Sequence, residues 1–252
     1  KRIEEINGII KHITEHNNEV VRHTSTVSAI NVYVSKLQQE ISDLDSKKDS
    51  LEEENAKLKE LKETLKDLVA KQKELAEARI AKASLSNLIT VELRDYRDLE
   101  GQYDAVVSVE MIEAVGEKYW PTYFAAISKH LKPGGRFGLQ AITMPHDRLM
   151  ASKHAYTWIH KYIFPGGIIP SREVIDQYTK AELKLVDSLS IRMGYAETLR
   201  LWREKFMENQ TKVISLGFDE EFLRMWQYYL AYSEAGFRSG HLDVWQLGFI
   251  KK

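Results

Sequence analysis

Among the residue types that most often act in catalysis or metal binding, this chain contains His but no Cys. Its 252 residues include 8 His but no Cys, so thiol nucleophiles, thiolate metal sites and disulfides are excluded. His154 and His160 stand six residues apart, whereas two metal ligands on one helical face need a spacing of four. We therefore predict no metal site, and the candidates that remain are carboxyl, amide and aromatic side chains.

The segments that must position these side chains alternate between strand-like and helix-like patterns. We predict helices over residues 74–85, 123–130 and 196–236, and strands over residues 89–93 (ITVEL), 103–111, 136–144, 183–191 and 241–250. The sequence Lys-Pro-Gly-Gly at 132–135 is a typical helix stop. Strands that alternate with helices predict an α/β fold built on a layered sheet.

Several blocks in this part of the chain resemble cyclopropane fatty acid synthases, which are S-adenosylmethionine-dependent methyltransferases. The blocks are RDYRD at 94–98, YDAVVSVEMIE at 103–113, LKPGG at 131–135, KYIFPGG at 161–167 and DVWQ at 243–246. LKPGG occurs in many methyltransferases, but KYIFPGG in order with the other blocks is specific. The resemblance implies a class I, Rossmann-like methyltransferase domain over residues 76–252.

The resemblance also implies a reaction and a catalytic site. Members of the family transfer a methyl group to a cis double bond of a fatty acyl chain, and a bound bicarbonate ion takes a proton from the resulting carbocation. The matching positions are Glu113, Gln140 and Tyr195. Burial beside an anion should raise the pKa of Glu113; capping of the next helix is the alternative for it, and core packing is the alternative for Tyr195. Gln140 replaces a common His and can hydrogen-bond the ion without shuttling a proton.

Cofactor and substrate positions follow from the same resemblance. Asp95 and Tyr96 stand where the family contacts adenine, with a polar strand exit as the alternative, and Gln72 matches a family glutamine near the cofactor. The acyl tunnel is predicted at Trp158, Tyr162 and Phe164, where aromatic faces could stabilise a cation or simply pack in the core. The implied substrate is the unsaturated acyl chain of a phospholipid, reached by transient contact with a membrane surface.

One part of the family pattern is missing. The glycine-rich turn that follows the first strand has no counterpart, because no Gly lies between Gly8 and Gly101. We therefore predict a partial sheet that lacks its first strands and leaves apolar strand edges exposed. Either ITVEL pairs directly with YDAVVSV, or another chain supplies the missing strands. Such a junction is expected of a fusion or a truncation.

The first 75 residues have the heptad pattern of a coiled coil. Position d holds Ile9, Ile30, Leu37, Leu44, Leu51, Leu58 and Leu65, and position a holds Ile6, Ile13, Val20, Val27, Val34, Ile41 and Val69. β-Branched residues at a, Leu at d and Asn55 at an a position favour a parallel homodimer. His16 and His23 on the seam are either tolerated polar residues or a pH-sensitive or metal-binding pair.

The overall charge and hydropathy limit the classes of partner and the cellular location that we expect for this chain. Lys and Arg number 36 against 37 Asp and Glu, so nothing calls for a nucleic acid. No run of about 18 apolar residues is present, and the first ten residues lack the features of a secretory signal. We expect a cytoplasmic protein that visits the membrane surface.

Two hypotheses follow. In the first, the chain is a lipid-modifying methyltransferase. In the second, the chain is a non-catalytic protein that dimerises or tethers through its coiled coil and carries a degenerate methyltransferase remnant. Binding of S-adenosylmethionine separates the two.

Overall fold

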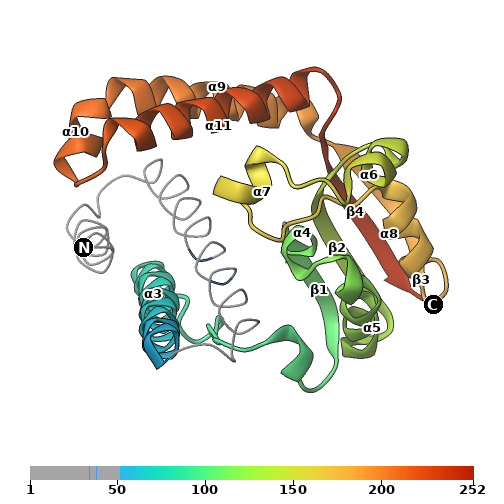
Figure 1. The fold of residues 1–252 in the computed structure, drawn as a ribbon. Coiled ribbons are helices and arrows are strands. Elements are labelled where there is room, and N and C mark those ends of the chain that lie inside the picture. Colours follow the sequence, from blue (N-terminus) through green and yellow to red (C-terminus); the bar gives the residue numbers. More distant parts are fainter. Residues whose placement is uncertain (1–33, 35–37, 39–51) are drawn as a thin grey trace. The chain divides into compact units, whose positions relative to one another are not determined.

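The computed structural model describes Val34, Gln38 and residues 52–252 (Figure 1). The chain divides into two compact units. One comprises Lys1–Asp95 with Tyr162–Pro165, and the other comprises Tyr96–Lys161 with Gly166–Lys252. The predicted catalytic residues all belong to the second unit.

The first unit contains one long described helix, α3 (Glu52–Lys82). It has no Gly or Pro to interrupt it, and it runs without a break across the boundary at residue 75 predicted between coiled coil and methyltransferase domain. Apart from Val34 and Gln38, the predicted coiled coil before residue 52 lies outside the described residues, and its pairing stays a prediction. No helix within the described ranges has the length and apolarity needed to cross a membrane.

The predicted strand ITVEL is wrong. Residues 89–95 form neither helix nor strand, and Ile89 and Leu93 expose 44% and 52% of their surface. A strand requires a hydrogen-bonded neighbour, and in the described part of the chain β1 (Tyr103–Val109) pairs only with β2 (Leu131–Thr143). The alternative in which ITVEL pairs directly with YDAVVSV is therefore also wrong.

The second unit is built on a four-stranded sheet in the order β1-β2-β4-β3. The other strands are β3 (Leu183–Ser190) and β4 (Asp243–Lys251). β1 and β2 are parallel, whereas β4 runs antiparallel to both β2 and β3. This mixed sheet, with helices between its strands, confirms the predicted α/β fold class for this unit.

The Lys-Pro-Gly-Gly segment lies inside β2 rather than before it. Tyr103 of β1 pairs with Leu131, but Ala105 pairs with Arg136, so residues 132–135 form an irregularity between two regular pairings. Gly134 has φ of 73°, a left-handed conformation that glycine adopts without a steric penalty. The turn residues therefore shape the strand and do not only end the preceding helix.

The helices of the second unit include both helical segments predicted there, at 123–130 and 196–236, and several shorter helices that were not predicted. They are α4 (Ile112–Val115), α5 (Trp120–His130), α6 (His146–Ser152), α7 (Trp158–Tyr162, whose last residue falls in the first unit), α8 (Arg172–Thr179), α9 (Arg192–Glu208), α10 (Gln210–Ser215) and α11 (Glu220–Arg238), with 3-10 turns at Tyr96–Asp98 and Glu117–Tyr119. The single helical run predicted over 196–236 is thus three helices. Gly217 has φ of 93°, and the Asp219 carboxylate accepts a hydrogen bond from the Phe222 backbone N–H at 2.8 Å to cap α11.

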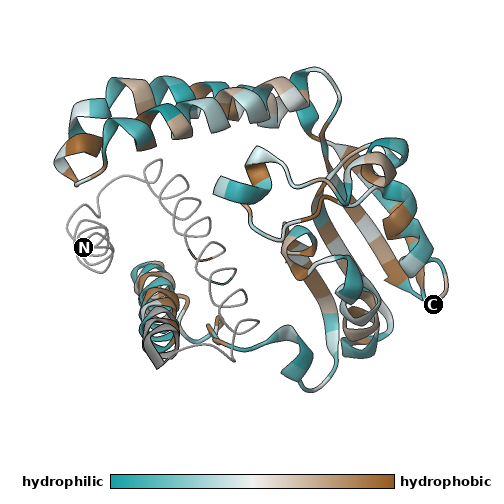
Figure 2. Cartoon of the chain, in the orientation of Figure 1, coloured by the Kyte–Doolittle hydropathy of each residue, from teal (hydrophilic) through white to brown (hydrophobic). Residues whose placement is uncertain are grey.

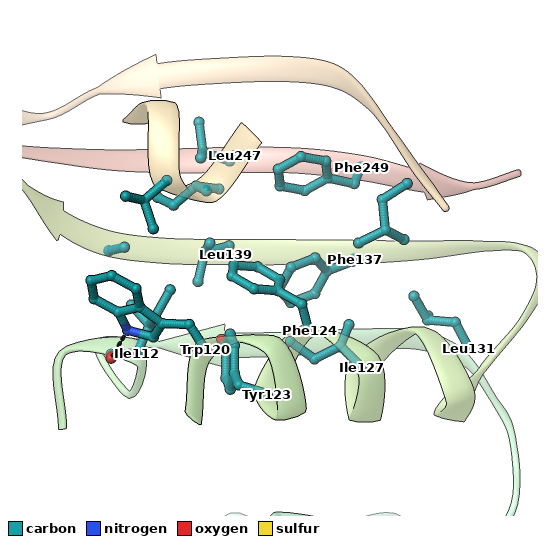
Figure 3. Packing of buried hydrophobic residues seen from close by; sticks show 14 of the residues in the cluster. Ile112, Trp120, Tyr123, Phe124, Ile127, Leu131, Phe137, Leu139, Leu247 and Phe249 are labelled. Atoms are coloured by element: carbon teal, nitrogen blue, oxygen red, sulfur yellow. Dashed lines mark hydrogen bonds between the residues drawn. The ribbon is translucent and has the colours of Figure 1, made fainter. Parts of the chain in front are cut away.

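The hydrophobic core lies on one face of the sheet, where α5 packs against β2 (Figure 3). Its members alternate along β2 and β4, as a strand buried on one face requires. Two polar side chains of the core are hydrogen-bonded. Trp120 Nε1 donates to the Ile112 carbonyl at 3.2 Å, and the Tyr123 hydroxyl donates to Ser108 Oγ at 2.7 Å. These contacts fix α5 against α4 and β1.

The other side of β1 is apolar and exposed. Val107 and Val109 keep 73% and 59% of their surface accessible, and Figure 2 shows hydrophobic stretches along the strands. Among the described strands β1 is also an outermost strand of the sheet, so the predicted exposed edge is present there and carries apolar side chains. Such an edge is a template for further strand pairing.

Candidate functional site

The candidate site lies where the parallel strands β1 and β2 end. Val109, the last residue of β1, pairs with Gln140 of β2, and the Glu110 N–H donates to the Gln140 carbonyl at 2.8 Å. The carboxyl ends of parallel strands are the usual place for ligand sites in α/β proteins. Glu110, Glu113 and Gln140 all come from this edge.

A hydrogen-bond network joins two of the predicted catalytic residues to a third side chain. Gln140 Nε2 donates to the Tyr195 hydroxyl oxygen at 2.7 Å and to Glu110 Oε1 at 3.0 Å. The Tyr195 hydroxyl in turn donates to Glu110 Oε1. Gln246 Nε2 on β4 donates to Gln140 Oε1 at 2.8 Å. Both ends of the Gln140 amide are therefore used, which fixes its orientation.

Tyr195 reaches the network from the first turn of α9. Its ring packs at 5.5 Å against Phe237 of α11. Burial raises the pKa of the Tyr195 phenol above its ordinary value, and the bond to the Glu110 carboxylate raises it further. Burial also raises the pKa of Tyr229 to about 12, with the charge of Glu110 adding to the effect. Both phenols are therefore neutral hydrogen-bond donors near pH 7.

Glu113 lies in α4, just after β1, with its carboxyl group turned inward. Oε1 accepts from the Ile142 N–H at 2.6 Å, and Oε2 is buried with no hydrogen-bond partner among the described residues. Burial raises the pKa of Glu113 to about 7, backbone hydrogen bonds from Glu113 and Ile142 oppose the shift, and the charge of Glu110 adds to it. The predicted rise is thus confirmed in direction.

Helix capping, the alternative interpretation of Glu113, is wrong. Met111, not Glu113, occupies the N-cap position of α4, and the Met111 side chain makes no capping hydrogen bond. The Glu113 carboxyl bonds instead to the backbone of β2, so it belongs to the edge of the sheet where the other polar groups meet.

Glu110 is the residue that the sequence interpretation missed. It lies within the block YDAVVSVEMIE, but its sequence neighbours do not distinguish it from Glu113. In the structure its φ is 50°, which is uncommon for a residue with a side chain. This backbone turn lets its carboxylate meet Gln140 and Tyr195, and no sequence pattern used above detects it.

The predicted cofactor residues are divided between the two units. Gln72 in α3 and Asp95 belong to the first unit and Tyr96 to the second, so the structure defines no shared geometry for all three. Asp95 is exposed, while Tyr96 is half-buried and its ring packs edge-on against Tyr123 at 6.0 Å. Their role in binding adenine stays a prediction.

The predicted tunnel residues lie in and just after α7. Trp158 packs edge-on against Tyr228 of α11 with ring centroids 4.7 Å apart. Tyr162 and Phe164 each expose 36% of their surface. The contact of Trp158 is a packing contact between helices, and the acyl tunnel stays a prediction.

Comparison with known proteins identifies relatives for most of this chain. The family model described as mycolic acid cyclopropane synthetase matches residues 62–247. The tuberculostearic acid methyltransferase UfaA1 of Mycobacterium tuberculosis is 56% identical over 180 residues, which are 71% of this chain and 42% of that protein. The cyclopropane-fatty-acyl-phospholipid synthase of Escherichia coli is 37% identical over 163 residues, which are 65% of this chain and 41% of that protein.

A solved structure agrees with these relatives. The cyclopropane synthase MmaA2 from Mycobacterium tuberculosis superimposes with a TM-score of 0.59 at 27% identity, over 70% of this chain and 67% of that one. This chain spans about two fifths of the length of the two curated relatives. Since the family model covers well over half of its residues, the chain belongs to the mycolic acid cyclopropane synthetase family, whose members the sequence blocks resemble.

Proposed function

We propose that this chain transfers a methyl group from S-adenosylmethionine to the double bond of an unsaturated fatty acyl chain, as a cyclopropane-fatty-acyl-phospholipid synthase does. The observation that supports the proposal is the meeting of Gln140 and Tyr195 in one hydrogen-bond network, with the buried Glu113 carboxyl at the same edge of the sheet. The relative at 56% identity is itself a methyltransferase that is named for a fatty acid.

The family resemblance assigns the adenine of the cofactor to Asp95, which ends the first stretch of the first unit, and to Tyr96, which begins the second unit. An exposed carboxylate at Asp95 and a half-buried ring at Tyr96 have the chemistry that adenine needs, namely an acceptor for its amino group and an aromatic surface. When bound, S-adenosylmethionine supplies an electrophilic methyl group. The described residues before Gly101 contain no glycine, so a glycine turn for the rest of the cofactor is not among them.

The chain's own residues would act on the acyl chain after methyl transfer. A carbocation on the acyl chain must lose a proton, and the polar groups at the end of β1 and β2 are the acceptors and donors available. Glu113, with its raised pKa, is protonated in a large fraction of molecules near pH 7 and can donate as well as accept. Tyr195 donates, and Gln140 orients the network.

The bicarbonate ion of the sequence prediction fits this site only in part. Glu113 Oε2 is buried and has no described partner, which suits an additional hydrogen-bonding group. The donors of Gln140 and Tyr195, however, already bond to the Glu110 carboxylate. A bicarbonate ion would have to displace Glu110 to use them.

The proposed activity is tested with the purified full chain. We expect micromolar binding of S-adenosylmethionine by titration calorimetry. We also expect transfer of an isotopically labelled methyl group to vesicles of dioleoyl phospholipid, but not to vesicles of a fully saturated phospholipid. Replacement of Tyr96 with alanine should weaken cofactor binding through loss of its aromatic surface. No heat at millimolar ligand would reject the proposal and favour a non-catalytic coiled-coil protein.

We also propose that the protein is located in the cytoplasm and makes transient contact with a phospholipid surface. We propose in addition that it forms a homodimer through the coiled coil. Sedimentation equilibrium of a peptide of residues 1–75 tests the dimer. The apolar side chains at positions a and d of the heptads should be buried only when two helices pair. The expected mass is that of two chains. Replacing Leu44 and Leu51 with lysine should give a monomer, and a monomeric unsubstituted peptide would reject the dimer.

A further inference from the structure

We propose that the carboxylate of Glu110 is the resident anion of this site and the group that accepts the proton from the acyl carbocation, in place of a bicarbonate ion. The inference rests on the proposed function for the proton-transfer step. The position of the anion rests on the geometry alone.

The hydrogen bonds around Glu110 are those that a bound anion would receive. Its Oε1 accepts from Gln140 Nε2 at 3.0 Å and from the Tyr195 hydroxyl. These are two of the three residues predicted to hold bicarbonate. The third, Glu113, is close enough for the charge of Glu110 to contribute to its raised pKa. A carboxylate of the chain therefore occupies the centre of the predicted anion site.

The backbone is arranged to hold Glu110 in this position. Its φ of 50° places a residue with a side chain in the left-handed region, which is disfavoured and is found where the surrounding structure enforces it. The Glu110 N–H donates to the Gln140 carbonyl at 2.8 Å, so Glu110 bonds to Gln140 through both its backbone and its side chain. Gln246 fixes the Gln140 amide from the other side.

The chemistry balances without a further reactant. After methyl transfer the acyl chain carries a positive charge on carbon. If a C–H bond on the carbon next to the cation breaks, its electron pair forms a carbon–carbon double bond. If a C–H bond of the transferred methyl group breaks, its electron pair forms the bond that closes a cyclopropane ring. The proton goes to the Glu110 carboxylate, which becomes a neutral carboxyl group and later releases the proton to solvent. Gln140 cannot accept this proton, because an amide is not a base at neutral pH.

The position of the anion can be tested by binding alone. Glu110→Gly removes the carboxylate and suits the positive φ, so the variant should fold, as circular dichroism would verify. In nuclear magnetic resonance titrations with carbon-13-labelled bicarbonate and formate, we expect no saturable binding to the unsubstituted chain and saturable binding to Glu110→Gly. Adding Gln140→Ala to that variant should abolish the binding. Glu100→Gln is the control. It removes an exposed carboxylate before β1 and should behave like the unsubstituted chain.

The role of Glu110 as proton acceptor is tested by turnover in buffer freed of bicarbonate. We expect the unsubstituted chain to keep its rate and both Glu110→Gly and Glu110→Gln to lose about 100-fold or more, the usual contribution of a general base. Added formate or bicarbonate should restore part of the rate of Glu110→Gly. It should not restore Glu110→Gln, whose amide fills the same space without being a base.

The outcomes separate this inference from the proposed function. Saturable bicarbonate binding to the unsubstituted chain that depends on Gln140 would overturn the resident anion. Full turnover of Glu110→Gly without bicarbonate would overturn the proton acceptor. If no chain turns over but anion binding appears only in Glu110→Gly, the proposed activity fails and the assignment of Glu110 as the resident anion stands.

Discussion

Replacing Gly135 with alanine is expected to lower the free energy of unfolding of the second unit by about 2–3 kcal/mol. A Cβ at this position would lie 2.8 Å from the Lys132 carbonyl oxygen and 3.1 Å from the Asp104 carbonyl oxygen. Both are backbone atoms and cannot rotate away, so the β1–β2 pairing around the Lys-Pro-Gly-Gly irregularity must shift. Urea unfolding followed by tryptophan fluorescence measures the loss.

Gly138 provides the matched control on the same strand. A Cβ there would meet only Val107 Cγ2 at 3.6 Å, an ordinary van der Waals contact. Gly138→Ala should therefore be neutral or stabilise the protein by up to about 1 kcal/mol, because glycine loses more conformational entropy on folding than alanine. Equal destabilisation by the two substitutions would show that Gly135 is not constrained by the neighbouring carbonyl groups.

The contrast between these two glycines shows how much of the fold could be predicted. The pattern Lys-Pro-Gly-Gly correctly marks the end of α5, and the strand-like segments 103–111, 136–144, 183–191 and 241–250 correctly predict β1, β2, β3 and β4. The sequence does not show that Gly135 touches Asp104 of another strand, because that contact depends on strand register.

The failed strand at ITVEL has a related cause. Its β-branched and alternating residues have strand propensity, but propensity becomes structure only when a neighbouring strand is available. Within the described residues β1 pairs with β2 alone, and residues 89–93 stay irregular. Local pattern therefore predicted the strands that have partners and overpredicted the one that has none.

The site was predictable where the family resemblance assigns a role to a residue, and not elsewhere. The family resemblance identified Gln140 and Tyr195, and the structure brings them into a hydrogen bond. Glu110 was missed, since its function depends on a backbone angle of 50° that its sequence does not announce. Two acidic residues three positions apart thus have different environments. Glu110 receives side-chain hydrogen bonds, and Glu113 is buried against backbone.

That difference predicts an unusual dependence of stability on pH. Glu113→Gln is expected to make the protein more stable than the unsubstituted chain above pH 7, by about 3 kcal/mol, and to make no difference near pH 4. Burial raises the pKa of Glu113 from 4.5 to about 7 in the folded state, and each pKa unit corresponds to about 1.4 kcal/mol. The glutamine keeps an oxygen that can accept from the Ile142 N–H without carrying a charge.

The sign follows from proton binding in the two states. Between pH 4.5 and about 7 the folded chain holds a proton on Glu113 that the unfolded chain has released, so stability falls as pH rises through this interval and is constant above it. Urea unfolding of both chains from pH 4 to pH 8 measures the difference.

Glu117→Gln is the control, because it removes only an ion pair with Lys153 in which the glutamate side chain is 45% exposed. Such a pair contributes at most about 1 kcal/mol and in the opposite direction, since its loss destabilises the protein at neutral pH. A constant difference between Glu113→Gln and the unsubstituted chain across this range would mean that the Glu113 carboxyl group is solvated in the folded protein, and it would remove the raised pKa from the proposed mechanism.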